Sequence, residues 1–106
     1  RGAGGSPTMR VGDVGVDVDA HVVTVGGDPV HLTQKEFALL ELLARRPGRL
    51  LTHGAILEHV WPAGGGTTEP LRVHVTNLRR KLGPGAGVEV RTEPGVGYRL
   101  VPAEDA

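Results

Sequence analysis

Arginine, threonine and asparagine recur at helical spacing in one short stretch, residues 69–82, which reads EPLRVHVTNLRRKL. At 100° per residue, one face of a helix here holds Arg72, Val73, Thr76, Asn77 and Arg80. Arginine pairs with guanine and asparagine with adenine through two hydrogen bonds each, and the major groove of DNA admits one helix. The chemistry available to this face is therefore base recognition. Arg79 and Lys81 lie at its flanks, where they could meet phosphates.

The opposite side of the same stretch is apolar, which predicts that this helix packs on a core. The inward stripe, with spacing i, i+4, i+7 and i+11, consists of Leu71, Val75, Leu78 and Leu82. We expect Leu78 to be fully buried. Thr67 or Thr68 can cap the helix, and Pro70 costs little in the first turn, where its missing amide needs no partner. Gly83 and the proline after it end the helix.

The elements that must position this helix follow from hydrophobic periodicity. Residues 9–32 are valine-rich and alternating, with Val18 still in phase, and predict an antiparallel sheet of three or four strands. Thr33 and Glu36 form a capping box before a largely buried helix that ends at Pro47. Thr52 can cap a second helix, after a brief strand at 49–51.

The C-terminal part of the chain predicts a β-hairpin. Residues 88–92 and 97–101 alternate apolar and polar side chains, and the turn EPG at 93–95 separates them. The order sheet, helix, helix, helix, hairpin predicts an α+β fold, a winged helix-turn-helix in which the hairpin is the wing. The wing carries Arg91 and Arg99, which could meet DNA backbone, although Arg99 could equally pair with an acid of its own sheet.

Charge is unevenly distributed in a chain whose formal net charge is zero. Residues 69–99 carry six cationic side chains against three carboxylates, which suggests an anionic partner, although a solvated helix face is the ordinary alternative. Phosphate loops, nucleophile elbows and metal-ligand spacings are missing from the sequence, and there is no cysteine. We therefore expect no enzymatic activity, no metal and no cofactor.

With 106 residues, the chain predicts one domain at 9–101, a linker at 1–8 and a disordered tail at 102–106. Because the first residue is Arg1 and not methionine, we expect a piece of a longer protein. The sequence shows neither a signal peptide nor an apolar run long enough to span a bilayer. A cytoplasmic location is compatible with these features and with the lack of cysteine.

Three separated motifs resemble the OmpR/PhoB-type winged-helix domain of bacterial response regulators. They are LTQKEFALLELLARRPGRLLTHGAILEHVW, LRVHVTNLRRKLG and VEVRTEPGVGYRLV, and the resemblance covers residues 9–101. Arg72 after Leu71, together with TEPGVGYRL in the wing, most resembles the regulators of potassium-transport operons. The resemblance implies a sequence-specific double-stranded DNA-binding effector domain whose recognition helix spans residues 68–82.

The resemblance also implies further contacts. Thr92 and Tyr98 match wing positions that touch DNA backbone, and the loop at 62–67 matches a segment that can contact RNA polymerase. Such domains bind tandem half-sites, and we expect the isolated domain to be a monomer. Glu69 and Pro94 depart from the pattern, because many members have cationic side chains at the start of the recognition helix and in the wing turn. Both departures predict weaker binding by an isolated monomer.

Two alternatives remain open from the sequence. Some winged helices bind proteins, and the zero net charge and missing cations are compatible with a protein-interaction module. The salt dependence of binding distinguishes a DNA-binding domain from such a module, because the affinity for DNA falls steeply with salt concentration as counterions are released. The second alternative concerns the rest of the longer protein, which could be a phosphorylatable receiver or another domain, including an enzymatic one.

Overall fold

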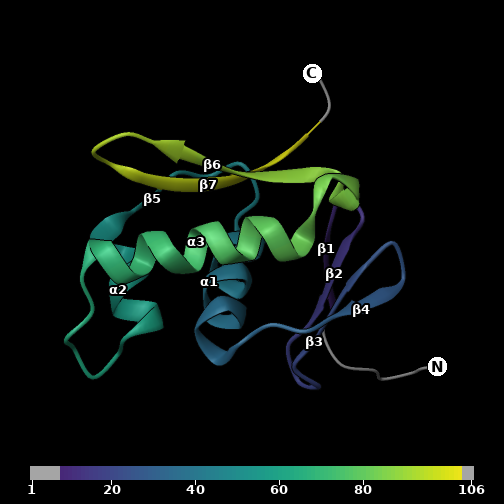
Figure 1. Cartoon of the computed structure of the whole chain (residues 1–106), viewed down its shortest axis with the longest axis horizontal. Helices are drawn as coiled ribbons and strands as arrows, with labels where there is room; N and C mark the ends of the chain where they lie inside the picture. Colours follow the sequence, from purple (N-terminus) through teal and green to yellow (C-terminus); the bar gives the residue numbers. More distant parts are fainter. Residues whose placement is uncertain (1–7, 104–106) are drawn as a thin grey trace.

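The computed structural model describes residues 8–103, which form two antiparallel sheets and three helices (Figure 1). The elements are β1 Thr8–Val11, β2 Val14–Asp17, β3 Val22–Val25, β4 Asp28–Val30, α1 Gln34–Arg45, β5 Leu51–Thr52, α2 His53–Val60, α3 Thr68–Leu82, the 3-10 turn η1 Pro84–Ala86, β6 Val88–Glu93 and β7 Gly97–Pro102. The expected α+β winged helix-turn-helix is confirmed. The strands reach one residue beyond each predicted domain boundary. Most of the predicted linker and tail lies outside the described residues.

The N-terminal sheet has the strand order β1-β2-β3-β4, with neighbouring strands antiparallel. In β2, Val14 and Val16 are buried, as the alternation predicts. The expectation that this strand continues to Val18 is wrong, because β2 ends at Asp17. There the Asp17 carboxylate accepts a hydrogen bond from the Ala20 amide at 3.0 Å, which starts the turn to β3.

Both predicted caps of α1 and α2 are confirmed. The Thr33 hydroxyl accepts from the Glu36 amide at 3.2 Å, and the Glu36 carboxylate accepts from the Thr33 amide at 3.0 Å, which closes the capping box of α1. The Thr52 hydroxyl accepts from the Ala55 amide at 3.2 Å at the start of α2. None of the helices within residues 8–103 is long and apolar enough to cross a membrane.

The second sheet has the order β5-β7-β6, and its outer two strands are far apart in the sequence. The short strand β5 pairs with the start of β7 through Leu51↔Tyr98 and Thr52↔Gly97. Gly97 is required there, because a Cβ atom at this position would collide with the Leu51 carbonyl oxygen. The pairing therefore supports β7 next to the wing turn, while β6 is left as an edge strand.

The two sheets meet at η1. The Asp13 amide donates to the Ala86 carbonyl at 2.9 Å, and the Ala103 amide donates to the Gly87 carbonyl at 2.9 Å. The turn between β1 and β2 and the end of β7 are therefore both bonded to the segment that follows α3. Gly12 in that turn has φ +57° and lies so close to Gly87 that a side chain would clash with it.

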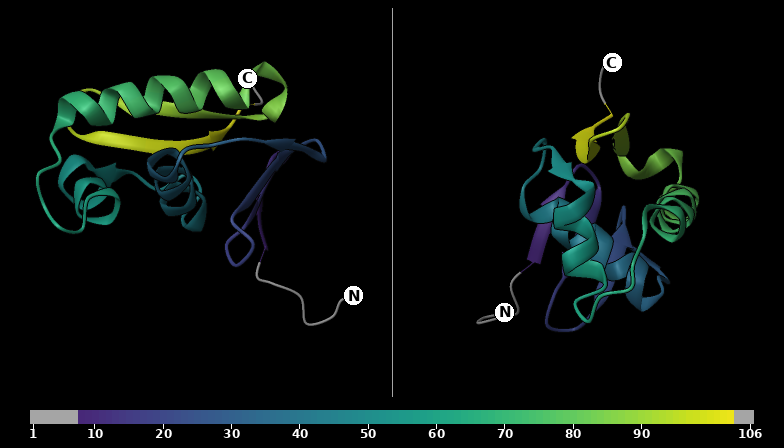
Figure 2. Two further views of the ribbon diagram at one scale, coloured as in Figure 1. Left: turned by 60° about the horizontal axis from the view of Figure 1, so that its bottom comes forward. Right: turned by 90° about the vertical axis from the view of Figure 1, so that its left-hand side faces the viewer.

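Helix α3 lies on the outside of the domain, between the wing and the two shorter helices. In Figure 1 it crosses in front of α1, with the hairpin β6–β7 above it and the N-terminal sheet at its C-terminal end. The second view of Figure 2 places α3 at the edge of the molecule. The wing turn and the N-terminal end of α3 lie at the same end of the domain, so one surface can present both.

Candidate nucleic-acid interface

Four of the five side chains on the outer face of α3 are exposed. Arg72, Thr76 and Arg80 are exposed, and Val73 has 54 % of its surface accessible, the largest value among the exposed large hydrophobic residues in the described part of the chain. Asn77 is half-buried, and its side-chain oxygen accepts from Arg80 Nη2 at 3.0 Å. The exposed valine lies among hydrogen-bonding side chains, an arrangement that fits a base edge with a thymine methyl group.

The inner face of α3 fixes the orientation of this surface. Leu71, Val75 and Leu78 have no accessible surface, and Leu82 is also buried. The predicted stripe is therefore confirmed, including complete burial of Leu78. Because this stripe packs into the core with α1, the outer side chains cannot rotate inward without breaking the core.

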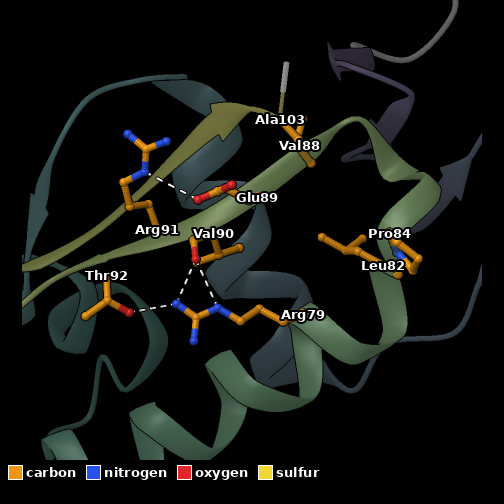
Figure 3. Close-up of a pocket in the computed structure, with 10 residues that line it drawn as sticks. Arg79, Leu82, Pro84, Val88, Glu89, Val90, Arg91, Thr92 and Ala103 are labelled. Carbon is orange, nitrogen blue, oxygen red and sulfur yellow. Dashed lines mark hydrogen bonds and ion pairs between the residues drawn. The ribbon is translucent and has the colours of Figure 1, made fainter. Parts of the chain in front are cut away.

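The structure gives Arg79 a partner within the domain, although the sequence placed it at a flank facing phosphate. Its Nε and Nη2 atoms donate to the Val90 carbonyl at 2.9 and 2.7 Å, and Nη2 also donates to the Thr92 hydroxyl at 2.7 Å. Figure 3 shows the side chain reaching from α3 to β6 along one wall of an open groove. Arg79 therefore links the helix to the wing.

Lys81 is also engaged inside the domain. Its ammonium lies 2.6 Å from the Glu36 carboxylate on α1, and the Glu36 side chain is 2 % exposed. Burial alone would raise the pKa of Glu36, but the hydrogen bonds from Lys81 and Thr33 and the charge of Lys81 outweigh it, so the pKa lies below its ordinary value. In the free domain the Lys81 side chain therefore turns toward α1, where it supplies the cation for the buried carboxylate. A contact between Lys81 and a phosphate stays a prediction.

The wing side chains are arranged on the β6–β7 hairpin. Arg91 is exposed and pairs loosely with Glu89, with 3.3 Å between Nε and Oε2, and both side chains are half exposed. Thr92 is exposed, whereas Tyr98 is only 5 % exposed and packs in the core. Arg99 faces Glu93 at 3.2 Å between Nε and Oε2 as an ion pair without an aligned hydrogen bond, so the alternative that it pairs with an acid of its sheet is confirmed.

The loop between α2 and α3 is anchored at one end by an aromatic side chain. Gly66 packs on the indole of Trp61 so closely that a Cβ atom would lie 2.5 Å from the ring. Lys35 Nζ lies 5.3 Å from the centre of the same ring, and the His74 imidazole of α3 lies 5.6 Å from it. The cluster therefore ties the end of the loop to α3, while Pro62 and the residues to 65 are exposed.

Comparisons with known proteins identify the family of this arrangement. Residues 27–100 match the family described as "Transcriptional regulatory protein, C terminal". Sensory transduction protein RegX3 of Mycobacterium tuberculosis is 47 % identical over 95 residues, which is 87 % of this chain and 42 % of that protein. Transcriptional regulatory protein KdpE of the same species is 41 % identical over 97 residues, which is 89 % of this chain and 43 % of that protein. The chain spans less than half the length of these relatives.

Solved structures agree with the family assignment. The DNA-binding domain of CpxR from E. coli has a TM-score of 0.81 at 29 % identity, covering 92 % of this chain and 99 % of that one. The DNA-binding domain of the response regulator AdeR, in complex with an intercistronic region, has a TM-score of 0.76 at 25 % identity, covering 89 % of this chain and 98 % of that one. The chain therefore belongs to the transcriptional regulatory protein C-terminal family, the OmpR/PhoB-type winged-helix DNA-binding domains of response regulators.

Proposed function

We propose that this domain binds double-stranded DNA sequence-specifically as the effector domain of a bacterial two-component transcriptional regulator. The observation that carries the proposal is the outer face of α3, where exposed arginine, threonine and valine side chains and a half-buried asparagine stand on a helix fixed by a fully buried stripe. Among the described residues, no carboxylate pairs with Arg72 or Arg80. Their charge is therefore available to a polyanion, which favours DNA as the partner.

The proposed contacts divide into those that read bases and those that position the domain. Base contacts come from the outer face of α3, namely Arg72, Val73, Thr76, Asn77 and Arg80. Arg91 and Thr92 on the wing meet the DNA backbone, and buried Tyr98 supports the strand beneath them. A phosphate contact by Lys81 stays a prediction outside this set, because its ammonium is held by Glu36 in the free domain.

Asn77→Ala tests the recognition face. The asparagine amide can pair with one adenine through a donor and an acceptor together, so its loss should cost about 1–3 kcal/mol on the preferred site. The same change should relax the preference at one base pair, as measured by titration against duplexes altered at single positions. Arg10→Ala is the matched control: Arg10 is an exposed residue of β1, outside the proposed interface, and its loss should leave affinity nearly unchanged. If both variants bind like the wild type, α3 does not read bases.

The salt dependence of wild-type binding separates DNA recognition from the alternative of a protein-interaction module. Each neutralised phosphate releases counterions, so log affinity for DNA should fall linearly with log salt concentration. A surface built for another protein should show no salt-dependent affinity for any duplex. Selection of binding sites from random DNA supplies the preferred duplex for this measurement.

Assembly on DNA is the next consequence of the proposal. Half-sites about 10 bp apart keep two recognition helices on one face of the duplex, so we expect tandem half-sites. The isolated domain should sediment as a monomer without DNA and bind direct repeats with at most weak cooperativity. A stable dimer in sedimentation of the free domain would contradict this.

Other parts of the proposal concern the full regulator. The domain acts in the bacterial cytoplasm, needs no cofactor and catalyses nothing, while a receiver or another domain lies in the rest of a longer chain. Contact with RNA polymerase through residues 62–67 stays a prediction. What supports it is the exposure of Pro62 and Ala63, together with the anchoring of the loop by Gly66 on Trp61.

A further inference from the structure

We propose that Arg79 is a positioning residue that holds the wing at a fixed distance from the recognition helix. This inference rests on the proposed function, because it concerns how the two DNA-binding elements are presented together. It assigns Arg79 a role different from that of Arg80, its neighbour in the sequence. Arg80 lies on the outer face and bonds only to Asn77 of the same helix among the described residues.

The contact made by Arg79 crosses from one DNA-binding element to the other. Val90 and Thr92 lie on β6, and Arg79 lies on α3. Two nitrogen atoms of one guanidinium donate to a single carbonyl, and one of them also donates to the Thr92 hydroxyl, so both the distance and the direction between helix and strand are set. A lysine ammonium could carry the charge but could not reproduce this fork.

The strand that Arg79 holds is otherwise unsupported on that side. In the sheet order β5-β7-β6, β7 pairs on both sides near the wing turn, whereas β6 pairs only with β7 within residues 8–103. The Val90 carbonyl points away from β7 and would lack a protein partner without Arg79. Arg79 thus supports one side of the wing as β5 supports the other.

The electrostatic environment shows that this contact is not an ordinary salt bridge. Arg79 pairs with none of the carboxylates in residues 8–103, and its Nη1 atom makes no hydrogen bond to any of those residues. Its positive charge is therefore retained while its position is fixed by neutral acceptors. Substituting lysine separates the two properties, since it keeps the charge and removes the forked contact.

The first test uses the free domain and needs no DNA. In nitrogen-15 NMR spectra near neutral pH, the Nε–H proton of Arg79 should exchange with water more slowly than that of Arg80, which bonds to Asn77 through Nη2 and not Nε. In Arg79→Lys, the amides of Gly95 and Val96 in the wing turn should become more mobile, while amides of α1 should not change. Equal exchange of the two arginines, with an unchanged wing, would overturn the proposal.

The second test measures binding to the selected duplex. Arg79→Lys should weaken binding about two- to tenfold, because the wing must then be ordered at the moment of binding. The slope of log affinity against log salt should stay the same, because the charge is kept. Arg45→Lys, an exposed arginine of α1 paired with Glu41, is the matched control and should bind like the wild type. Full affinity of Arg79→Lys would show that charge alone suffices and would refute the positioning role of Arg79.

The proposed function and the positioning role of Arg79 can fail separately. If the wild type binds no duplex in a salt-dependent way, the proposed function is wrong, and the exchange of the Arg79 Nε–H proton still decides whether Arg79 holds the wing. If the wild type binds and Arg79→Lys keeps full affinity, the proposed function survives and the positioning role is wrong.

Discussion

Leu78→Ala should destabilise the domain by about 2–5 kcal/mol, through lost burial of the side chain and the cavity left behind. Leu78 has no accessible surface and lies in the stripe by which α3 packs into the core. Since a domain of this size has a total stability of only about 5–15 kcal/mol, the loss is a large part of the whole. Chemical denaturation monitored by circular dichroism measures it.

Thr76→Ala on the outer face of α3 is the control for this change. The Thr76 side chain is exposed, and within the described part of the chain its hydroxyl bonds only to the Arg72 carbonyl of the same helix, at 3.0 Å. Its loss should alter stability by no more than about 0.5 kcal/mol. Equal stability of the Leu78 variant and the wild type would show that α3 packs in a different helical register.

Lys81→Met should cost about 3 kcal/mol at neutral pH, the lower end of the range for breaking a buried ion pair. The variant leaves the carboxylate of Glu36, 2 % exposed, without its cation. The amide of Thr33 still donates to that carboxylate, which keeps the loss from being larger. Glu36→Gln/Lys81→Met should recover much of the stability, because it removes the buried charge together with its partner.

The pH dependence of this variant has a definite sign. In the wild type the pKa of Glu36 lies below its ordinary value of 4.5, so its contribution to stability is present above that value and is lost as the pH falls through the folded-state pKa. Without Lys81, burial raises the pKa, and protonation then relieves the unpaired charge. The stability difference between wild type and Lys81→Met should therefore shrink on acidification from pH 7 to below pH ~4. A constant difference across this range would contradict the assigned pair.

Features of the fold that depend on neighbours in the sequence could be predicted from the sequence. The capping box of Thr33 and Glu36, the Thr52 cap and the inward position of Leu78 all follow from spacings of a few residues. Such features require only the geometry of one helical turn or stripe, which any helix supplies. The bounds 68–82 of the recognition helix are instead implied by the resemblance to the family, and α3 spans Thr68–Leu82.

The features that could not be predicted are contacts between elements far apart in the chain. Glu36 was expected only as a capping residue, and nothing near it in the sequence points to Lys81 on another helix. Helical periodicity gives only the angle of Arg79 around α3. That angle does not show that β6 runs beside the side chain and offers it the Val90 carbonyl. A long cationic side chain at the border of the apolar stripe can turn either way, and the position of the neighbouring element decides which.

The attachment of both the first turn and the last strand to the segment after α3 also affects when the domain can fold. The Asp13 amide can bond only after Ala86 has been made, and the Gly87 carbonyl only after Ala103 has been made. The first contact closes a loop that spans most of the domain, and the second requires the residue that follows β7. Contacts between distant residues slow folding, and a ribosome adds only about 5–20 residues per second. The strands of the N-terminal sheet can thus pair with one another before the hydrogen bond from Asp13 to Ala86 can form. Helix α1 can already cover part of the α3 stripe, but the core stays incomplete until Val88, Val90 and Leu100 of the wing have left the ribosome.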